Sequence, residues 1–190
     1  AKKYDESATS YTQAKASWNK LKPQELSKDL EEKILYKLGW SLFHGKQFAE
    51  ALEAFKAELA AFGSGALAAD AQFMVGECLF RQDKFAEAMP AYQKAKTLPA
   101  SSKEIEVLIL LHGGQSAAQT KKYDEATKWF DELTTKHPTS PFVSEATYEQ
   151  GWVLQQQKKP DEALKLYETA ATTHRGEVGA RARFMMGEIH

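Results

Sequence analysis

Histidine and cysteine are the side chains of this 190-residue sequence best suited to metal ligation or nucleophilic attack, and there are five histidines and one cysteine. No two histidines lie three or four residues apart, the spacing that places two ligands on one face of a helix. Cys78 stands alone, which excludes an internal disulfide framework and a multi-cysteine metal site. The sequence has no nucleophile elbow and no glycine-rich phosphate loop after a strand. We therefore expect no catalytic residue, no metal, no cofactor and no enzymatic activity.

Charge and hydropathy exclude two further classes of partner. Basic and acidic residues, 25 and 26 in number, are interspersed and leave a net charge of −1, so no field attracts nucleic acid or anionic lipid. The longest apolar run, near residues 107–111, is far too short to cross a bilayer, and the N-terminus lacks the apolar segment of a signal peptide. We expect no nucleic acid partner and no direct membrane insertion.

Glycines at regular intervals divide the sequence into similar stretches. They lie 37, 38, 37 and 36 residues apart, at Gly39, Gly76, Gly114, Gly151 and Gly187. Nine residues after each of the first four comes an aromatic residue or proline, namely Phe48, Phe85, Tyr123 and Pro160. An alanine follows three residues later and an aromatic residue four after that, as in Ala88 and Tyr92. Regular gaps of this size indicate a solenoid of stacked helical units.

Apolar residues at helical spacing, separated by glycine, proline and polar clusters, place the elements. We expect helices over residues 3–18, 24–44, 48–62, 66–82, 84–97, 101–120, 122–137, 141–157, 160–174 and 181–190. Ser101 followed by Glu104 predicts a capping box at one helix start, and Ser140-Pro141 predicts another start. Gly179 is expected in the turn before the last helix. The prediction is an all-α fold of about ten helices.

The repeated small residues have a packing role, because two helices can cross closely only where the contact residue is small. A glycine inside a helix costs about 1 kcal/mol relative to alanine, so we expect the second helix of each unit to pack on the bare backbone there. The alanine should supply the matching small surface. The aromatic residue four later is expected to fill the gap between one unit and the next.

A small residue in the first helix, an aromatic opening the second, then alanine and a further aromatic together resemble the tetratricopeptide repeat (TPR). The resemblance implies a TPR-like α-α superhelix, a right-handed solenoid of antiparallel helix pairs. It covers the chain as a single domain over residues 1–190, a fragment of a longer array. Its parts are the second helix of a truncated repeat, four repeats and the first helix of a truncated repeat, over residues 1–20, 24–63, 65–99, 101–138, 140–175 and 177–190.

The repeats are longer than usual, and Pro160 replaces one aromatic residue. An aromatic residue three before the glycine, as at Tyr36 and Phe73, makes them similar to repeats of bacterial envelope proteins. Those include the periplasmic partner of the Tol–Pal system and the lipoproteins of outer-membrane assembly. This likeness favours a periplasmic or cell-envelope location over a cytoplasmic one.

In tetratricopeptide arrays the first helices line a concave surface that binds partner peptides. Carried over to this sequence, the resemblance implies a partner-binding face made of Tyr36, Trp40, Phe43, His44, Phe73, Glu77, Phe80, Arg81, Gln115, Gln119, Tyr148, Trp152, Gln155 and Gln156. An alternative role for Tyr36, Phe73, Tyr148 and Phe184 is packing between neighbouring first helices, and the same alternative applies to Trp40 and Trp152. The lysines and asparagines with which some such domains clamp a C-terminal carboxylate are missing at the corresponding positions.

The leading function is a non-catalytic scaffold that binds a protein or peptide partner in this groove. One alternative is a self-assembling module, because apolar residues occur near both ends of the chain, at Tyr4, Tyr11 and Trp18 and at Phe184, Met185, Met186 and Ile189. Another is the regulatory arm of a larger enzyme.

Overall fold

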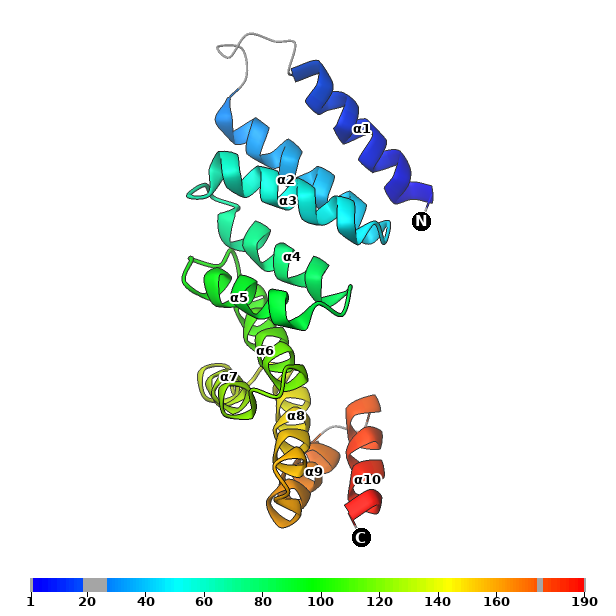
Figure 1. Cartoon of the computed structure of the whole chain (residues 1–190), viewed down its shortest axis with the longest axis vertical. Coiled ribbons are helices and arrows are strands. Elements are labelled where there is room, and N and C mark those ends of the chain that lie inside the picture. Colours follow the sequence, from blue (N-terminus) through cyan, green and yellow to red (C-terminus); the bar gives the residue numbers. More distant parts are fainter. Residues whose placement is uncertain (1, 19–26, 174–175, 190) are drawn as a thin grey trace. The chain divides into compact units, whose positions relative to one another are not determined.

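The structure is a computed structural model that describes residues 2–18, 27–173 and 176–189. These residues form ten α-helices and no β-strand, which confirms the all-α prediction (Figure 1). None of the helices so described is long and apolar enough to cross a membrane. The helices are α1 (Lys2–Trp18), α2 (Lys28–His44), α3 (Phe48–Phe62), α4 (Ala68–Phe80), α5 (Phe85–Lys96), α6 (Lys103–Gln119), α7 (Tyr123–Lys136), α8 (Val143–Gln156), α9 (Pro160–Thr173) and α10 (Glu177–Ile189).

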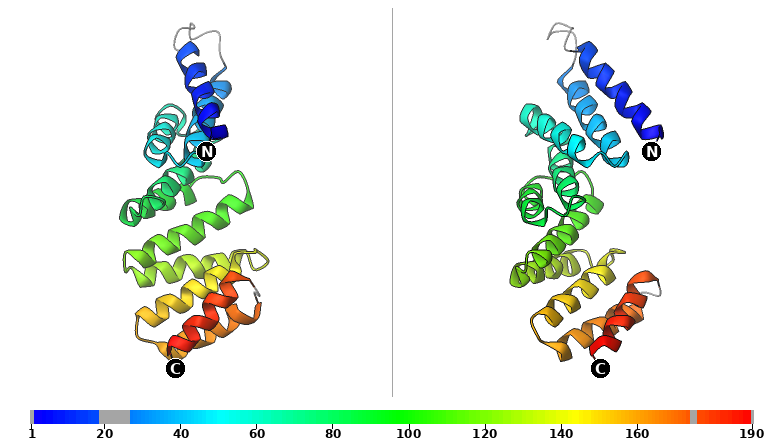
Figure 2. Two further views of the ribbon diagram at one scale, coloured as in Figure 1. Left: turned by 90° about the vertical axis from the view of Figure 1, so that its right-hand side faces the viewer. Right: turned by 45° about the vertical axis from the view of Figure 1, so that its right-hand side comes forward.

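The chain divides into an N-terminal unit, Ala1–Ile105, and a C-terminal unit, Glu106–His190, and each is described by itself. In the N-terminal unit each helix from α1 to α5 packs on the next, and α2 also contacts α4 (Figure 2). In the C-terminal unit α7, α8, α9 and α10 pack in the same consecutive way, and α8 contacts α10. First helices of successive repeats therefore touch each other as well as their own second helices.

An aromatic ring lies directly on the repeated glycine in each of the four complete repeats. Phe55, Tyr92, Phe130 and Tyr167, each sixteen residues after its glycine, are 0% exposed. A methyl group added at Gly76 would lie 2.5 Å from Cε1 of Tyr92, and one at Gly151 would lie 2.9 Å from the Tyr167 ring. The close helix contact was predicted correctly. The ring, however, packs within its own repeat on the bare glycine, rather than only in the gap to the next repeat.

The turn between the two helices of a repeat has the same geometry four times. In each turn the residue two positions before the start of the second helix has a positive φ. These residues are Lys46, Asp83, Lys121 and Lys158. In each turn the backbone N–H of the following residue donates to the carbonyl oxygen five residues before it, for example Lys122 N to Ala117 O at 2.9 Å. This is the Schellman end of a helix, which satisfies carbonyls that would otherwise lack partners. It fixes where the second helix turns back.

Three predicted boundaries are wrong, and the predicted start of the second helix at residue 24 lies outside the described residues. The N-cap of α6 is Ser102, whose Oγ accepts from Ile105 N at 3.2 Å, because Ser101 instead donates to Asp70 at 2.6 Å. α8 begins at Val143, two residues past Pro141, which lies in a turn. α10 begins at Glu177 and contains Gly179.

One buried position departs from the repeat. Three residues after the covering ring stand Ala95, Leu133 and Ala170, all 0% exposed, but the first complete repeat has Glu58 there, also 0% exposed. Neither carboxyl oxygen of Glu58 has a hydrogen-bond partner among the described residues. Burial, and secondarily the Glu32 carboxylate, raises the pKa of Glu58 to about 7. Here the core contains an acid where its counterparts are apolar.

Two other buried acids of this unit, Glu32 and Asp70, are already hydrogen-bonded. Glu32 Oε1 accepts from Leu67 N at 2.7 Å, and Asp70 accepts from Ser101. Tyr36 lies near this group, since burial, and then the charges of Asp70 and Glu58, raise the pKa of its hydroxyl to about 12. The charged group that acts on Glu58 is thus another acid, Glu32, rather than a cation.

The glycine contact predicts opposite effects of one substitution at two sites. Gly76→Ala should lower the free energy of unfolding by about 1–3 kcal/mol, because the methyl group overlaps the Tyr92 ring. Gly187→Ala should raise it by about 0.5–1 kcal/mol, because a methyl group there has nothing within 4 Å and alanine favours a helix. Urea denaturation of dilute protein measures both. Equal effects at the two glycines would contradict the ring contact.

The buried acid predicts a pH-dependent stability. The pKa of Glu58 is higher in the folded protein than the value of about 4.3 in the unfolded chain, so the folded state binds more protons between these values. The contribution of Glu58 to stability therefore falls as pH rises from about 4.3 through about 7 and is constant above. Glu58→Leu should stabilise the protein by about 1–3 kcal/mol at pH 8 and by less at pH 5.

Urea denaturation at the two pH values measures this difference. The control is Glu53→Leu on the same helix, whose side chain is 72% exposed and pairs with Lys56. We expect the control to leave the pH dependence unchanged. A Glu58→Leu variant with the pH dependence of the unsubstituted protein would show that Glu58 does not titrate in this range.

Candidate functional site

The predicted binding residues occupy four positions on the first helices, counted from the packing glycine. They stand three residues before it and one, four and five residues after it, on α2 and α4 in the N-terminal unit and on α6 and α8 in the C-terminal unit. Residues at these spacings share one side of a helix only in part, because each residue turns by about 100°. The structure accordingly gives the four positions different surroundings.

The residues three before the glycine lie in the core. Phe73 and Tyr148 are 4% and 6% exposed, and Tyr36 is half-buried. Each ring contacts the ring that covers the glycine of its own repeat, with centroid distances of 5.6 Å for Tyr36, 6.1 Å for Phe73 and 5.5 Å for Tyr148. These three residues therefore pack on the second helix of their own repeat, whereas Phe184, at the same position of α10, is 67% exposed.

Two polar candidates each accept a hydrogen bond from the hydroxyl of a buried tyrosine. Tyr92 Oη donates to Glu77 at 2.6 Å, and Tyr167 Oη donates to Gln155 at 2.8 Å. Burial, with the Glu77 carboxylate next in importance, raises the pKa of Tyr92. In the other two repeats the covering ring is phenylalanine and brings no hydroxyl. Glu77 and Gln155 thus complete the core contacts of their repeats, and Arg81 Nη2 lies 3.6 Å from Glu77.

The phenylalanines four after the glycine close the turn to the second helix. Phe43 meets Phe48 edge-on at 5.3 Å between ring centroids, and Phe80 meets Phe85 in the same way at 5.1 Å. Arg81 is exposed and lies 6.0 Å from the centre of the Phe80 ring. Phe43 and Phe80 therefore hold the helix pair together at its tip.

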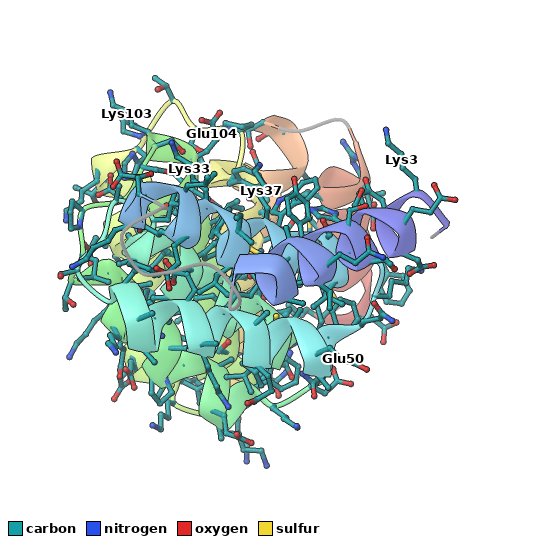
Figure 3. All side chains as sticks on the ribbon, turned by 90° about the horizontal axis from the view of Figure 1, so that it is seen from above. Lys3, Lys33, Lys37, Glu50, Lys103 and Glu104 are labelled. Atoms are coloured by element: carbon teal, nitrogen blue, oxygen red, sulfur yellow. The ribbon has the colours of Figure 1, made fainter. Side chains whose placement is uncertain are left out.

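The N-terminal unit carries an aromatic cluster that we call the Trp40 cluster, made of Tyr4, Trp40 and His44. Trp40 is half-buried. The centroid of its ring lies 4.0 Å from the ring centroid of His44 and 6.0 Å from that of Tyr4. Tyr4 stacks on His44 at 5.3 Å. Lys37, labelled in Figure 3, brings its ammonium nitrogen to 5.5 Å from the centre of the Trp40 ring. Desolvation lowers the pKa of His44, so the imidazole is neutral at pH 7.

The C-terminal unit has a polar network across three first helices. Gln115 on α6 donates to Glu149 on α8 at 3.0 Å, and Arg181 on α10 donates to Glu145 at 2.9 Å. Arg181 also lies 3.7 Å from Glu149 and 4.2 Å from the centre of the Tyr148 ring. Burial raises the pKa of Glu149. The network ties successive repeats together and engages Gln115.

The side chains of the remaining candidates in the C-terminal unit are partly or fully exposed to solvent. Trp152 is half-buried and meets Tyr123 edge-on, with ring centroids 6.5 Å apart. Gln119 and Gln156 are exposed near the ends of α6 and α8. These three residues keep surface that a partner can reach.

Five residues of the Trp40 cluster and of the polar network were not predicted from the sequence. They are Tyr4, Lys37, Glu145, Glu149 and Arg181. A signal existed for one pair, since Glu145 and Arg181 stand 36 residues apart, at the same repeat position and with opposite charges. No comparable signal marks Tyr4, which joins Trp40 from the separate helix α1. Contacts between neighbouring repeats require the three-dimensional arrangement.

Comparisons with known proteins agree with this fold. The sequence model of the tetratricopeptide repeat family matches residues 1–66 and 36–103. No curated protein sequence matches the chain. Among solved structures, the chain is similar to YrrB, a TPR protein with an unusual peptide-binding site, at 21% identity and a TM-score of 0.68, covering 82% of this chain and 76% of YrrB.

Two further structures have the same fold. MamA is 18% identical with a TM-score of 0.71, over 88% of this chain and 86% of MamA. The apo form of RapI is 17% identical with a TM-score of 0.80, over 99% of this chain and 55% of RapI. Identities this low show the fold alone, and the narrower likeness to bacterial envelope proteins stays a prediction. Because the two family matches together cover residues 1–103, more than half of its length, this chain belongs to the tetratricopeptide repeat family.

Proposed function

We propose that this protein is a non-catalytic interaction module that binds a segment of a protein partner on its first helices, with the Trp40 cluster as the main anchor site. Proteins of this family generally act as interaction scaffolds rather than catalysts. The partner segment carries an apolar or aromatic side chain that packs beside Trp40, with an acidic residue next to it for Lys37.

The half-buried Trp40 ring is the observation that carries this proposal. Tryptophan is enriched among residues that dominate binding energy, because it buries a large area at a small entropic cost. His44 and Tyr4 hold the ring in place, which reduces the freedom that it would lose on binding. The candidates that keep open surface elsewhere on the predicted face are Arg81, Gln119, Trp152 and Gln156.

The one cysteine of the sequence is buried, which argues against its use as a nucleophile. Cys78 is 0% exposed, and burial, with Glu77 as the second cause, raises the pKa of its thiol to about 12, so it stays protonated. No group of three His, Cys, Asp or Glu residues within the described part of the chain is arranged to hold a metal ion. YrrB, which shares the fold, is described as having a peptide-binding site, and this supports a peptide as the ligand class.

Substitution of Trp40 tests the proposal. Peptides are selected from a display library on the immobilised chain, and their Kd values are measured by fluorescence anisotropy. Trp40→Ala should weaken binding by roughly thirty-fold, equivalent to about 2 kcal/mol, because truncation removes the anchor contact. Trp152→Ala should have a smaller effect.

The matched control is Leu30→Ala on the same helix α2, an apolar side chain that is 46% exposed and lies about 15 Å from Trp40 along the helix axis. Circular dichroism and urea denaturation show whether each variant is folded. Selected peptides that bind the double variant Trp40→Ala and Trp152→Ala as tightly as the unsubstituted chain would contradict the proposed face.

A further inference from the structure

Glu58 on α3 is a buried carboxyl group that packing of the repeats does not require. Its side chain is 0% exposed, and neither carboxyl oxygen has a hydrogen-bond partner among the described residues. The counterparts Ala95, Leu133 and Ala170 are apolar and equally buried. Buried polar groups are nearly always hydrogen-bonded, so an unpartnered carboxyl group indicates a place where a donor can bind.

A second buried acid, Glu32 on α2, lies close to Glu58. Glu32 is 6% exposed, and its charge adds to the effect of burial in raising the pKa of Glu58. Glu32 Oε1 accepts from Leu67 N at 2.7 Å. Two neighbouring carboxylates repel each other when both are ionised, and a cation between them removes this repulsion. The pair is therefore suited to a cationic donor.

The Glu32 carboxylate lines an open cavity of about 470 Å³ between the start of α2 and the end of α3. This volume is in the range of small-ligand sites. The charged residues of the lining are Lys28, Asp29, Glu31 and Glu32, so acids outnumber the one lysine. The charge of Lys28 acts on Glu31, whereas the charge that acts on Glu58 is that of Glu32. The cavity thus attracts cations.

The wall of this cavity leads to Glu58. Ala61 and Phe62 line the cavity and stand three and four residues after Glu58, so the three residues share one side of α3. In the loop after α3, a methyl group added at Gly65 would overlap the Glu32 carboxylate. Gly65 therefore lets the loop backbone lie directly against this acid. The lining combines apolar surface with carboxylates, which suits an aliphatic chain that ends in a cation.

We propose that this cavity binds an ammonium or guanidinium group at the end of an aliphatic chain, with the cation between the carboxylates of Glu32 and Glu58. Such a group donates several hydrogen bonds and balances the charge of both acids. The aliphatic chain packs on Phe62. Lysine and arginine side chains and free alkylamines share this chemistry. The site is separate from the Trp40 cluster and does not depend on the proposed function.

An NMR titration of the 190-residue chain with n-butylguanidinium and n-butylammonium chloride tests the proposal. At pH 8 and constant ionic strength, the backbone amide signal of Leu67, which donates to Glu32, should shift saturably. We expect a Kd of about 1 mM, because so small a ligand makes few contacts. The neutral probe 1-butanol should cause no such shift. A Leu67 signal that does not respond saturably to either cation would overturn the proposal.

Three substitutions locate the cation. Glu58→Gln keeps the shape of the side chain and removes its charge, so it should weaken binding by about ten-fold or more. The matched control Glu53→Gln makes the same change on α3 at a side chain that is 72% exposed, and it should change the Kd by less than about two-fold. Glu31→Gln removes another charge from the lining. An effect of Glu31→Gln as large as that of Glu58→Gln would place the cation away from Glu58 and contradict the proposal.

Binding should also depend on pH, because the cation pairs with ionised Glu58. Between pH 8 and pH 5 the Kd should rise by about ten-fold or more, since Glu58 is mostly protonated at pH 5. Saturation with n-butylguanidinium should in turn lower the pKa of Glu58, followed by the ¹³C signal of its carboxyl carbon. Tyr36, which also acts on this region, stays protonated in this range because its pKa is about 12. Equal Kd values at pH 5 and pH 8 would contradict binding at Glu58.

Further arms of the titration distinguish the source of the cation and the two sites. N-acetylarginine methylamide presents the guanidinium as a protein side chain does. Binding at least as tight as that of n-butylguanidinium would support a protein segment as the occupant, and binding of the butyl cations alone would support a free amine. Trp40→Ala should leave the Kd of both butyl cations unchanged, so failure of peptide binding and failure of cation binding are separate outcomes.

Discussion

The contact of an aromatic ring with a bare glycine backbone is the interaction on which the structure depends. The ring can approach the first helix only where no Cβ is present, and a methyl group at these glycines would lie 2.5–2.9 Å from ring atoms. Glycine costs about 1 kcal/mol in a helix, whereas burying an aromatic side chain contributes about 4–6 kcal/mol at most. The balance favours the close contact, which sets how the two helices of every repeat cross.

The chemical identity of the ring then decides which polar residues the neighbouring helix needs. A tyrosine at the covering position brings a buried hydroxyl that must be hydrogen-bonded, and Glu77 and Gln155 accept from the two tyrosines. Phenylalanine makes no such demand, and the residues at the corresponding positions are used differently. Trp40 joins an aromatic cluster and Gln115 joins a polar network. Variation among repeats thus follows from core chemistry as well as from binding.

One departure from the repeat places a titratable group in the core. Glu58 stands in place of an apolar core residue in the first complete repeat, where the buried Glu32 carboxylate acts on it. The regular positions therefore describe how the fold is built, and Glu58 indicates where pH can act on it.

The sequence alone determined the all-α repeat fold, nearly every helix and the glycine-to-ring register, because helical periodicity and repeat spacing are carried by residues close together in the chain. It could not predict that Ser101 would bind Asp70, that Glu77 would accept from Tyr92, or that Arg181 would join Glu145 and Glu149. These partners stand 15 to 36 residues apart, on separate helices. Only the tertiary structure decided which candidate side chains are buried in the core and which, like Trp40, remain partly exposed. Burial depends on how the helices face one another.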